Sequence, residues 1–154
     1  KSLNRDEKNS SDTSSTRDVL IDVAKKFNIP DSDFIVLLYL VYPDRKWETV
    51  ENAISFIEKN NSTSLLCKKE VKCTPYLIFF EEEDHKGTKV INHDLCRRQD
   101  YRKCFSLSHY VGIFQVKILE SLDTNTWMKE TIFFPIESWV DVDTEEDLEN
   151  FLNK

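Results

Sequence analysis

Apolar residues recur at helical spacing in two stretches of the first half of the chain. The first stretch starts after Ser15, and Asp18 follows three residues later, which is the spacing of an N-terminal helix cap. Its apolar positions are Val19, Leu20, Val23, Ala24 and Phe27. The second stretch runs over 49–59, with apolar positions at Val50, Ala53, Ile54 and Ile57. Both patterns predict amphipathic helices, the first ending before Pro30 and the second at Asn60.

Continuous apolar runs predict strands between these helices and after them. The run over 34–41, Phe-Ile-Val-Leu-Leu-Tyr-Leu-Val, is too short for a confident helix and predicts a strand buried on both faces. Further strands are predicted at 64–67, 75–80, 109–114, 131–136 and 139–142. A short helix is predicted at 116–122, and a last helix begins at Thr144, which forms a second cap with Asp147.

Strands that alternate with helices predict an α/β fold with a largely parallel sheet. The segment 64–107 interrupts this alternation with consecutive extended stretches. We therefore expect a single α/β domain over 1–154, with 64–107 as an insertion.

Composition and charge restrict the function. The chain has 154 residues, about one domain, and a net charge of −7 from 21 basic and 28 acidic residues. An acidic chain has no long-range attraction for DNA, so a general nucleic-acid binder is not expected. The only glycines are Gly87 and Gly112, which cannot build a Gly-rich phosphate loop.

The same composition bears on localisation. Because there is no apolar run of membrane-spanning length and no signal-like opening, we expect a cytoplasmic protein without a membrane segment. The cysteines, Cys67, Cys73, Cys96 and Cys104, lack zinc-knuckle spacing and are expected to be reduced thiols. Since the chain opens with Lys1 and its only methionine is Met128, we expect a piece of a longer protein.

Asp141 and Asp143 form the sharpest candidate site. On a strand, alternation would place both carboxylates on one face, about 7 Å apart, at the edge where α/β sheets bind ligands. Together they could hold Mg²⁺, which prefers oxygen ligands and substrate phosphates. The alternative is that these acidic residues stabilise the start of the following helix through its dipole.

Three further groups could bind anions. Arg97, Arg98 and Gln99, with Arg102 and Lys103 close behind, form either a site for a carboxylate or phosphate, or a solvated charged segment. Arg45 follows the apolar run and could face an anion or lie in a surface turn. Ser14 and Ser15 precede the first predicted helix, where they could bind an anion or cap the helix. His109, beside Ser108, is expected to be a core or strand-end histidine without a catalytic partner.

Five short segments occur in a distinctive order between Asp12 and Leu152. They are Asp-Thr-Ser-Ser at 12–15, Leu-Leu-Tyr-Leu-Val-Tyr-Pro-Asp-Arg at 37–45, Pro-Tyr at 75–76, Arg-Arg-Gln-Asp at 97–100 and Val-Asp-Val-Asp-Thr-Glu-Glu-Asp-Leu at 140–148. In this order they resemble the C-terminal two thirds of the acylneuraminate cytidylyltransferases, also called CMP-sialic acid synthetases. The last segment is the most specific, because several consecutive residues match.

The resemblance implies a Rossmann-like nucleotidyltransferase sheet, truncated at its N-terminus, with 64–107 as a dimerisation arm. It implies that CTP and a nonulosonic acid, a nine-carbon 2-keto sugar acid, give CMP-sugar and pyrophosphate. By this resemblance Asp141 and Asp143 hold Mg²⁺ and carry catalysis. The implied substrate-binding residues are Arg98, Gln99, Ser14, Ser15, Arg45 and Ser108, and the implied assembly is a homodimer that delivers an arginine to the neighbouring active site.

The chain also departs from that family. Tyr39, Leu40, Val41 and Tyr42 replace its Gln-Pro-Thr-Ser, Ser108-His109-Tyr110 replaces its Asn-Gly-Ala, and Ile78 stands where a lysine is common. A nucleotide loop rich in Gly, Arg and Lys has no counterpart in the chain. These departures leave open a second interpretation, a non-catalytic relative that binds a sugar acid or a protein partner.

Overall fold

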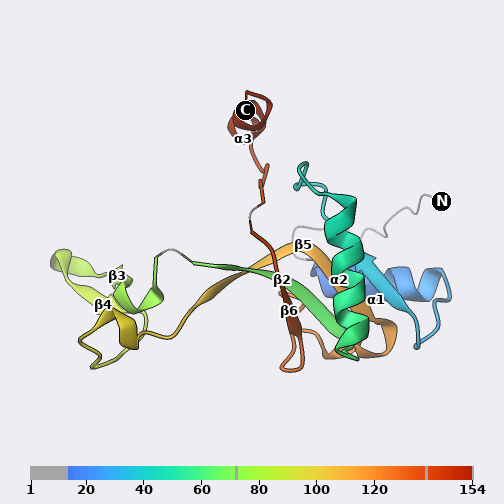
Figure 1. Ribbon diagram of the computed structural model, residues 1–154, viewed down its shortest axis with the longest axis horizontal. Coiled ribbons are helices and arrows are strands. Elements are labelled where there is room, and N and C mark those ends of the chain that lie inside the picture. Colours follow the sequence, from blue (N-terminus) through green and yellow to red (C-terminus); the bar gives the residue numbers. More distant parts are fainter. Residues whose placement is uncertain (1–13, 72, 138, 154) are drawn as a thin grey trace.

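The computed structural model describes residues 14–71, 73–137 and 139–153. Its main sheet has four strands in the order β1 (Phe34–Leu37), β5 (Phe105–Gln115), β2 (Ser64–Glu70) and β6 (Ile132–Pro135) (Figure 1). The α/β class is therefore confirmed. The prediction of a largely parallel sheet is wrong, because β5 lies between β1 and β2 and is antiparallel to both. Among the described strands, only β2 and β6 pair in parallel.

Helices cover the two faces of this sheet. The helix α2 (Trp47–Lys59) packs through Val50, Ala53 and Ile57 on the face that carries Leu65. The helix α1 (Thr16–Lys26) and the 3-10 helix η5 (Val116–Ser121) cover the opposite face, which carries Leu66 and Phe114. Consecutive residues of a strand point to opposite faces, so the run of buried residues in β2 supplies both cores. The helices predicted after Ser15, over 49–59 and over 116–122 are confirmed as α1, α2 and η5.

The strand β1 differs from the prediction for 34–41. It has four residues and lies at an edge of the sheet, and Phe34 and Val36 are 45% and 37% exposed. Burial on both faces is therefore wrong, because no strand lies on its outer side among the described residues. The segment after Leu37 leaves the sheet and packs on the α2 face through Leu38, Tyr39 and Val41.

Two other predicted strands also differ from the structure. Pro75–Leu77 forms the 3-10 turn η2, which suits a proline at its first position, and the strand β3 follows as Phe79–Glu81. Among the described residues, 139–143 form no strand, and their one backbone–backbone hydrogen bond runs from Val142 N–H to the Val41 carbonyl. The helix α3 (Glu145–Leu152) follows, and its predicted capping box of Thr144 and Asp147 is confirmed.

The strands β2 and β5 continue into an arm, residues 71–104, that projects away from the sheet (Figure 1). The arm contains η2, the hairpin of β3 and β4 (Gly87–Lys89), and the 3-10 turns η3 (Glu83–His85) and η4 (Arg98–Asp100). Tyr76 stacks on Tyr101 with ring centroids 4.8 Å apart, and His93 packs edge-on against both. The first residues of 64–107, Ser64 to Cys67, are fully buried in the main sheet, so the projecting part is shorter than the predicted insertion.

In the described part of the chain, no helix is long and apolar enough to cross a membrane.

Candidate active site

The candidate site lies where β1 and β6 end. The segment 38–46 follows β1 and the segment 136–144 follows β6, so both leave the same edge of the sheet. They are joined by the bond from Val142 N–H to the Val41 carbonyl, at 2.9 Å, and by a bond from Val140 N–H to Asp44 Oδ2, at 3.1 Å. This carboxyl-terminal edge is where open α/β sheets bind ligands.

Asp141 and Asp143 are both exposed on the second of these segments. Their predicted placement on one face of a strand is not realised, because the segment is not a strand. They nevertheless interact: partial burial, together with the negative charges of Asp143 and Asp147, raises the pKa of Asp141. A bound cation would offset this repulsion.

The donor chemistry at this position fits Mg²⁺. Groups of three or more Cys, His, Asp or Glu side chains that could hold a metal are not found among the described residues. A pair of carboxylates is nevertheless a sufficient protein contribution for Mg²⁺, which keeps several waters and takes further ligands from substrate phosphates. Asp147 has a different role: its hydrogen bonds with Thr144 lower its pKa and cap α3.

Tyr42 connects the carboxylates to Ser108. Burial raises the pKa of the Tyr42 hydroxyl, and the nearby charges of Asp141 and Asp143 add to this effect. Hydrogen bonding with the Ser108 side chain opposes the rise. Through Tyr42, the structure brings Ser108 to the same edge of the sheet as Asp141. The sequence placed Tyr42 in the family-like segment 37–45 and marked it as a departure from the family, but it gave no sign of a contact with Asp141 or Ser108.

The start of α1 reaches this edge through Tyr39. Ser15 caps the helix: its hydroxyl accepts from Asp18 N–H at 3.1 Å and donates to Asp18 Oδ2 at 2.7 Å. The hydroxyls of Thr16 and Tyr39 share a hydrogen bond. Tyr39 also packs edge-on against His109, with ring centroids 5.5 Å apart. Ser14 and Ser15 thus directly precede Thr16, which contacts Tyr39 of the site. Of the two roles that the sequence left open for Ser15, the structure shows helix capping.

Arg45 holds the segment 38–46 on β5. Its Nε donates to the Tyr110 carbonyl at 2.9 Å, and its Nη2 donates to the Tyr39 carbonyl. The guanidinium also lies over the rings of Tyr42 and Tyr110, at 5.6 and 5.4 Å from their centroids. Arg45 is therefore a half-buried positioning residue of this site rather than a charge in a solvated turn.

Arg98 and Gln99 do not lie beside Asp141 and Asp143 in the structure. They belong to η4 in the arm, which projects away from the edge that carries Asp141 (Figure 1). Arg97 forms a two-pronged ion pair with Asp100, with both N–O distances at 2.9 Å. Arg98 instead lines a cavity of about 520 Å³ at the base of the arm, beside Arg102 and Lys103. A single chain therefore does not bring the arginine segment to the carboxylates.

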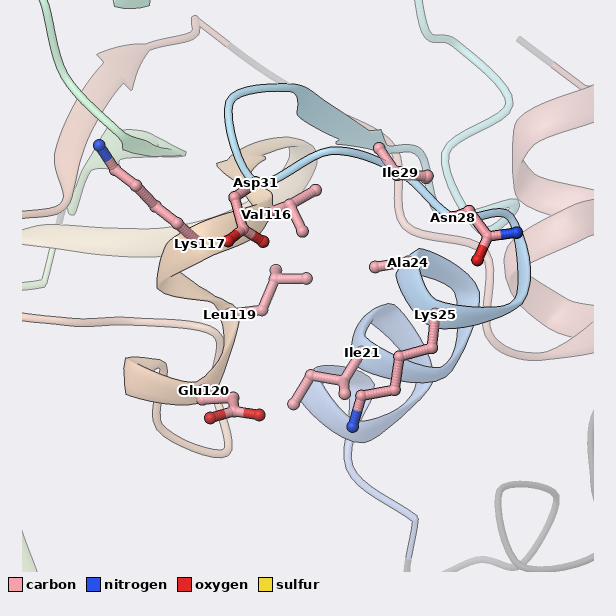
Figure 2. Close-up of a pocket in the computed structure, with 10 residues that line it drawn as sticks. All are labelled: Ile21, Ala24, Lys25, Asn28, Ile29, Asp31, Val116, Lys117, Leu119 and Glu120. Carbon is pink, nitrogen blue, oxygen red and sulfur yellow. The ribbon is translucent and has the colours of Figure 1, made fainter.

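A separate cleft of about 490 Å³ lies between α1 and η5 (Figure 2). Figure 2 shows Ile21, Ala24 and Lys25 on α1 facing Leu119 and Glu120 on η5. The residues that follow β5 also line it, and the end of β5 pairs with the start of β1. The cleft therefore lies at the end of the sheet opposite to Asp141.

Comparison with solved structures identifies a protein with the same fold. No family model and no curated protein matches the sequence. A solved structure does match: CMP:2-keto-3-deoxy-manno-octonic acid synthetase complexed with CTP, with a TM-score of 0.59 and 12% identity, over 91% of this chain and 67% of that chain. The chain has the fold of this synthetase.

This likeness confirms the predicted nucleotidyltransferase-like fold. At 12% identity, the match to the synthetase shows the fold alone. The resemblance to the acylneuraminate cytidylyltransferases rests on the sequence segments, and this match does not test it. The synthetase was solved with its nucleotide, CTP.

Proposed function

We propose that this protein is a cytidylyltransferase that joins CMP from CTP to a 2-keto sugar acid and releases pyrophosphate. The observation that carries the proposal is the pair of interacting carboxylates, Asp141 and Asp143, at the carboxyl-terminal edge of a sheet with the synthetase fold. The family resemblance of the segment 140–148 supports the same chemistry.

In this proposal Asp141 and Asp143 hold Mg²⁺, which supplies charge neutralisation for the triphosphate and the departing pyrophosphate. The anomeric hydroxyl of the sugar acid attacks the α-phosphate, so a new oxygen–phosphorus bond forms while the bond to the β-phosphate breaks. Ser14 and Ser15 face the nucleotide from the start of α1. Ser108 contacts the substrate, and Tyr42 orients the substrate. Arg45 holds in place the loop that carries Tyr42.

The arm supplies the sugar-acid contacts in a homodimer. Four consecutive apolar residues of the arm, Leu77, Ile78, Phe79 and Phe80, are 41–63% exposed, and a two-stranded unit is marginal alone in water. A second copy that packs on this surface would bury it in an isologous interface. Because Arg97 is paired with Asp100, Arg98 and Gln99 are the residues we assign to the neighbouring sugar site.

The substrate class that we favour is a nonulosonic acid, because the segments 97–100 and 140–148 resemble enzymes that use nine-carbon acids. The octonic acid of the solved synthetase is the obvious competitor. Arg98→Lys should raise the KM for the sugar acid more than the KM for CTP, since lysine loses the bidentate fork that suits a carboxylate. An equal rise in both constants would contradict the assignment of Arg98.

The central experiment measures pyrophosphate release by the full-length protein with CTP, Mg²⁺ and either an eight- or a nine-carbon 2-keto sugar acid. Asp141→Asn and Asp143→Asn each remove a charge at nearly constant shape and should lower turnover by several orders of magnitude. Glu130→Gln, an exposed change outside the arm and before the start of β6, is the matched control. Turnover at the level of the unaltered protein in either Asn variant would contradict the site.

A non-catalytic relative is the second candidate, and specific contacts favour it. Tyr39 replaces a residue of the family's sugar-contacting segment, and its hydroxyl is engaged by Thr16. Arg45 donates to two carbonyls of its own chain. Calorimetry distinguishes the candidates: a binding relative takes up the sugar acid without releasing pyrophosphate from CTP. Light scattering at micromolar concentration tests the dimer, and a clean monomer that still turns over CTP would reject the shared site.

A further inference from the structure

The base of the arm brings two of the cysteines to one cavity. The ladder of β2 and β5 pairs Glu70 with Phe105, and the next bond runs from Val71 N–H to the Cys104 carbonyl at 3.1 Å. Cys73 follows shortly on the outgoing side, and Cys104 lies on the returning side. Both line the cavity of about 520 Å³ at the base of the arm.

We propose that Cys73 and Cys104 are a reversible disulfide pair that closes the base of the arm. Cys73 is exposed and Cys104 is half-buried, so both are reachable by a small molecule. Neither is held in a disulfide in this structure, where Cys104 Sγ donates to the Arg102 carbonyl at 3.4 Å.

The other two cysteines provide internal comparisons. Cys67 is fully buried in β2, and burial raises the pKa of its thiol to about 11, so it is protected from exchange. Cys96 is also exposed, but it is not among the described residues that line the cavity. Exposure alone therefore does not select the pair; their shared position at the base of the arm does.

The reaction is thiol–disulfide exchange with a low-molecular-weight disulfide such as oxidised glutathione. The Cys73 thiolate attacks one sulfur, the small disulfide bond breaks, and one glutathione thiolate leaves. The Cys104 thiolate then attacks Cys73 Sγ of the mixed disulfide and releases the second glutathione thiolate. The two protons of the protein thiols end on the two glutathione thiols, so the protein loses two electrons and the small disulfide gains them.

The disulfide would enclose residues 74–103, nearly the whole arm. That loop includes the hairpin of β3 and β4 and the turn η4, which carries Arg98. Cross-linking the two strands at the base reduces the conformations open to the unfolded arm, and longer loops gain more from this restriction. Oxidation would therefore make the arm more resistant to local unfolding without altering the main sheet.

The test places the full chain in buffers with graded ratios of oxidised to reduced glutathione. Free thiols are then blocked, and peptides are mapped by mass spectrometry. The expected result is a cross-linked peptide of Cys73 and Cys104 within one chain, and cleavage of the oxidised arm by a protease slowed about tenfold. Cys73→Ser and Cys104→Ser should each abolish both effects, whereas Cys96→Ser should leave them unchanged. Far-UV circular dichroism verifies that each variant is folded.

Several outcomes would overturn the proposal. They are a glutathione adduct on Cys73 that never resolves, a cross-link between two chains, a cross-link that involves Cys96, and an intramolecular pair that leaves protease cleavage of the arm unchanged. Blocking the free thiols with N-ethylmaleimide before denaturation is a second measurement, and it needs no variant. Cys73 and Cys104 should be modified in the reduced protein and protected together in the oxidised protein, with Cys67 unmodified in both.

Discussion

Replacing Arg45 by methionine tests how the candidate site is held together. The change keeps an unbranched side chain but removes two hydrogen bonds, to the carbonyls of Tyr39 and Tyr110, and two contacts with aromatic rings. Hydrogen bonds from a charged donor contribute about 1.5–3 kcal/mol each, and cation–π contacts about 0.5–1 kcal/mol each. Because Arg45 is half-buried, we take the lower values and expect a loss of about 4 kcal/mol.

Urea unfolding, followed by circular dichroism, measures this loss. With a dependence of roughly 2 kcal/mol per molar urea, the midpoint should fall by about 2 M at unchanged slope. Arg45→Lys is the matched control: it keeps the charge and one donor, and should lose about half as much. A methionine variant within about 0.5 kcal/mol of the unaltered protein would refute the reasoning, because that is the range of ordinary surface substitutions.

Three further predictions test local features. Gly112→Ala should lower stability by about 1–3 kcal/mol, more than the roughly 0.5–1 kcal/mol gained by removing a strand glycine, and thermal unfolding measures it. The reason is that its Cβ would lie 2.9 Å from the fully buried ring of Phe114, and an unchanged melting temperature would contradict this. Ser15→Ala should cost about 1 kcal/mol of helix-cap energy in urea unfolding, and Ser15→Asn should restore it, so equal losses would argue against the cap. The Asp141→Asn variant should be more stable than the unaltered protein at neutral pH, because a pKa that is raised on folding makes the ionised carboxylate unfavourable to the folded state. The difference in stability should vanish below pH 3.8, the ordinary pKa of the carboxyl, where Asp141 is protonated in both states. A variant that is less stable than the unaltered protein at pH 7 would contradict this prediction.

The sequence by itself determined the features that depend on neighbouring residues. The helix caps at Ser15 and Thr144 rest on partners three residues away, and both formed as predicted. The run at 64–67 could be predicted as a buried strand from its own hydrophobicity. The candidate carboxylates, Asp141 and Asp143, were likewise recognisable from their spacing and their position before a helix.

The tertiary structure decided what depends on distant partners. Whether 139–142 is a strand depends on a neighbouring strand, and the segment finds one backbone bond to Val41. The position of β5 between β1 and β2, which makes the sheet mixed, is likewise set by pairing between residues far apart in sequence. The contacts of Arg45 and Tyr42 also join distant segments. Local sequence fixes backbone propensity and burial, but pairing free energy depends on which surfaces meet, and that is decided only when the whole chain has packed.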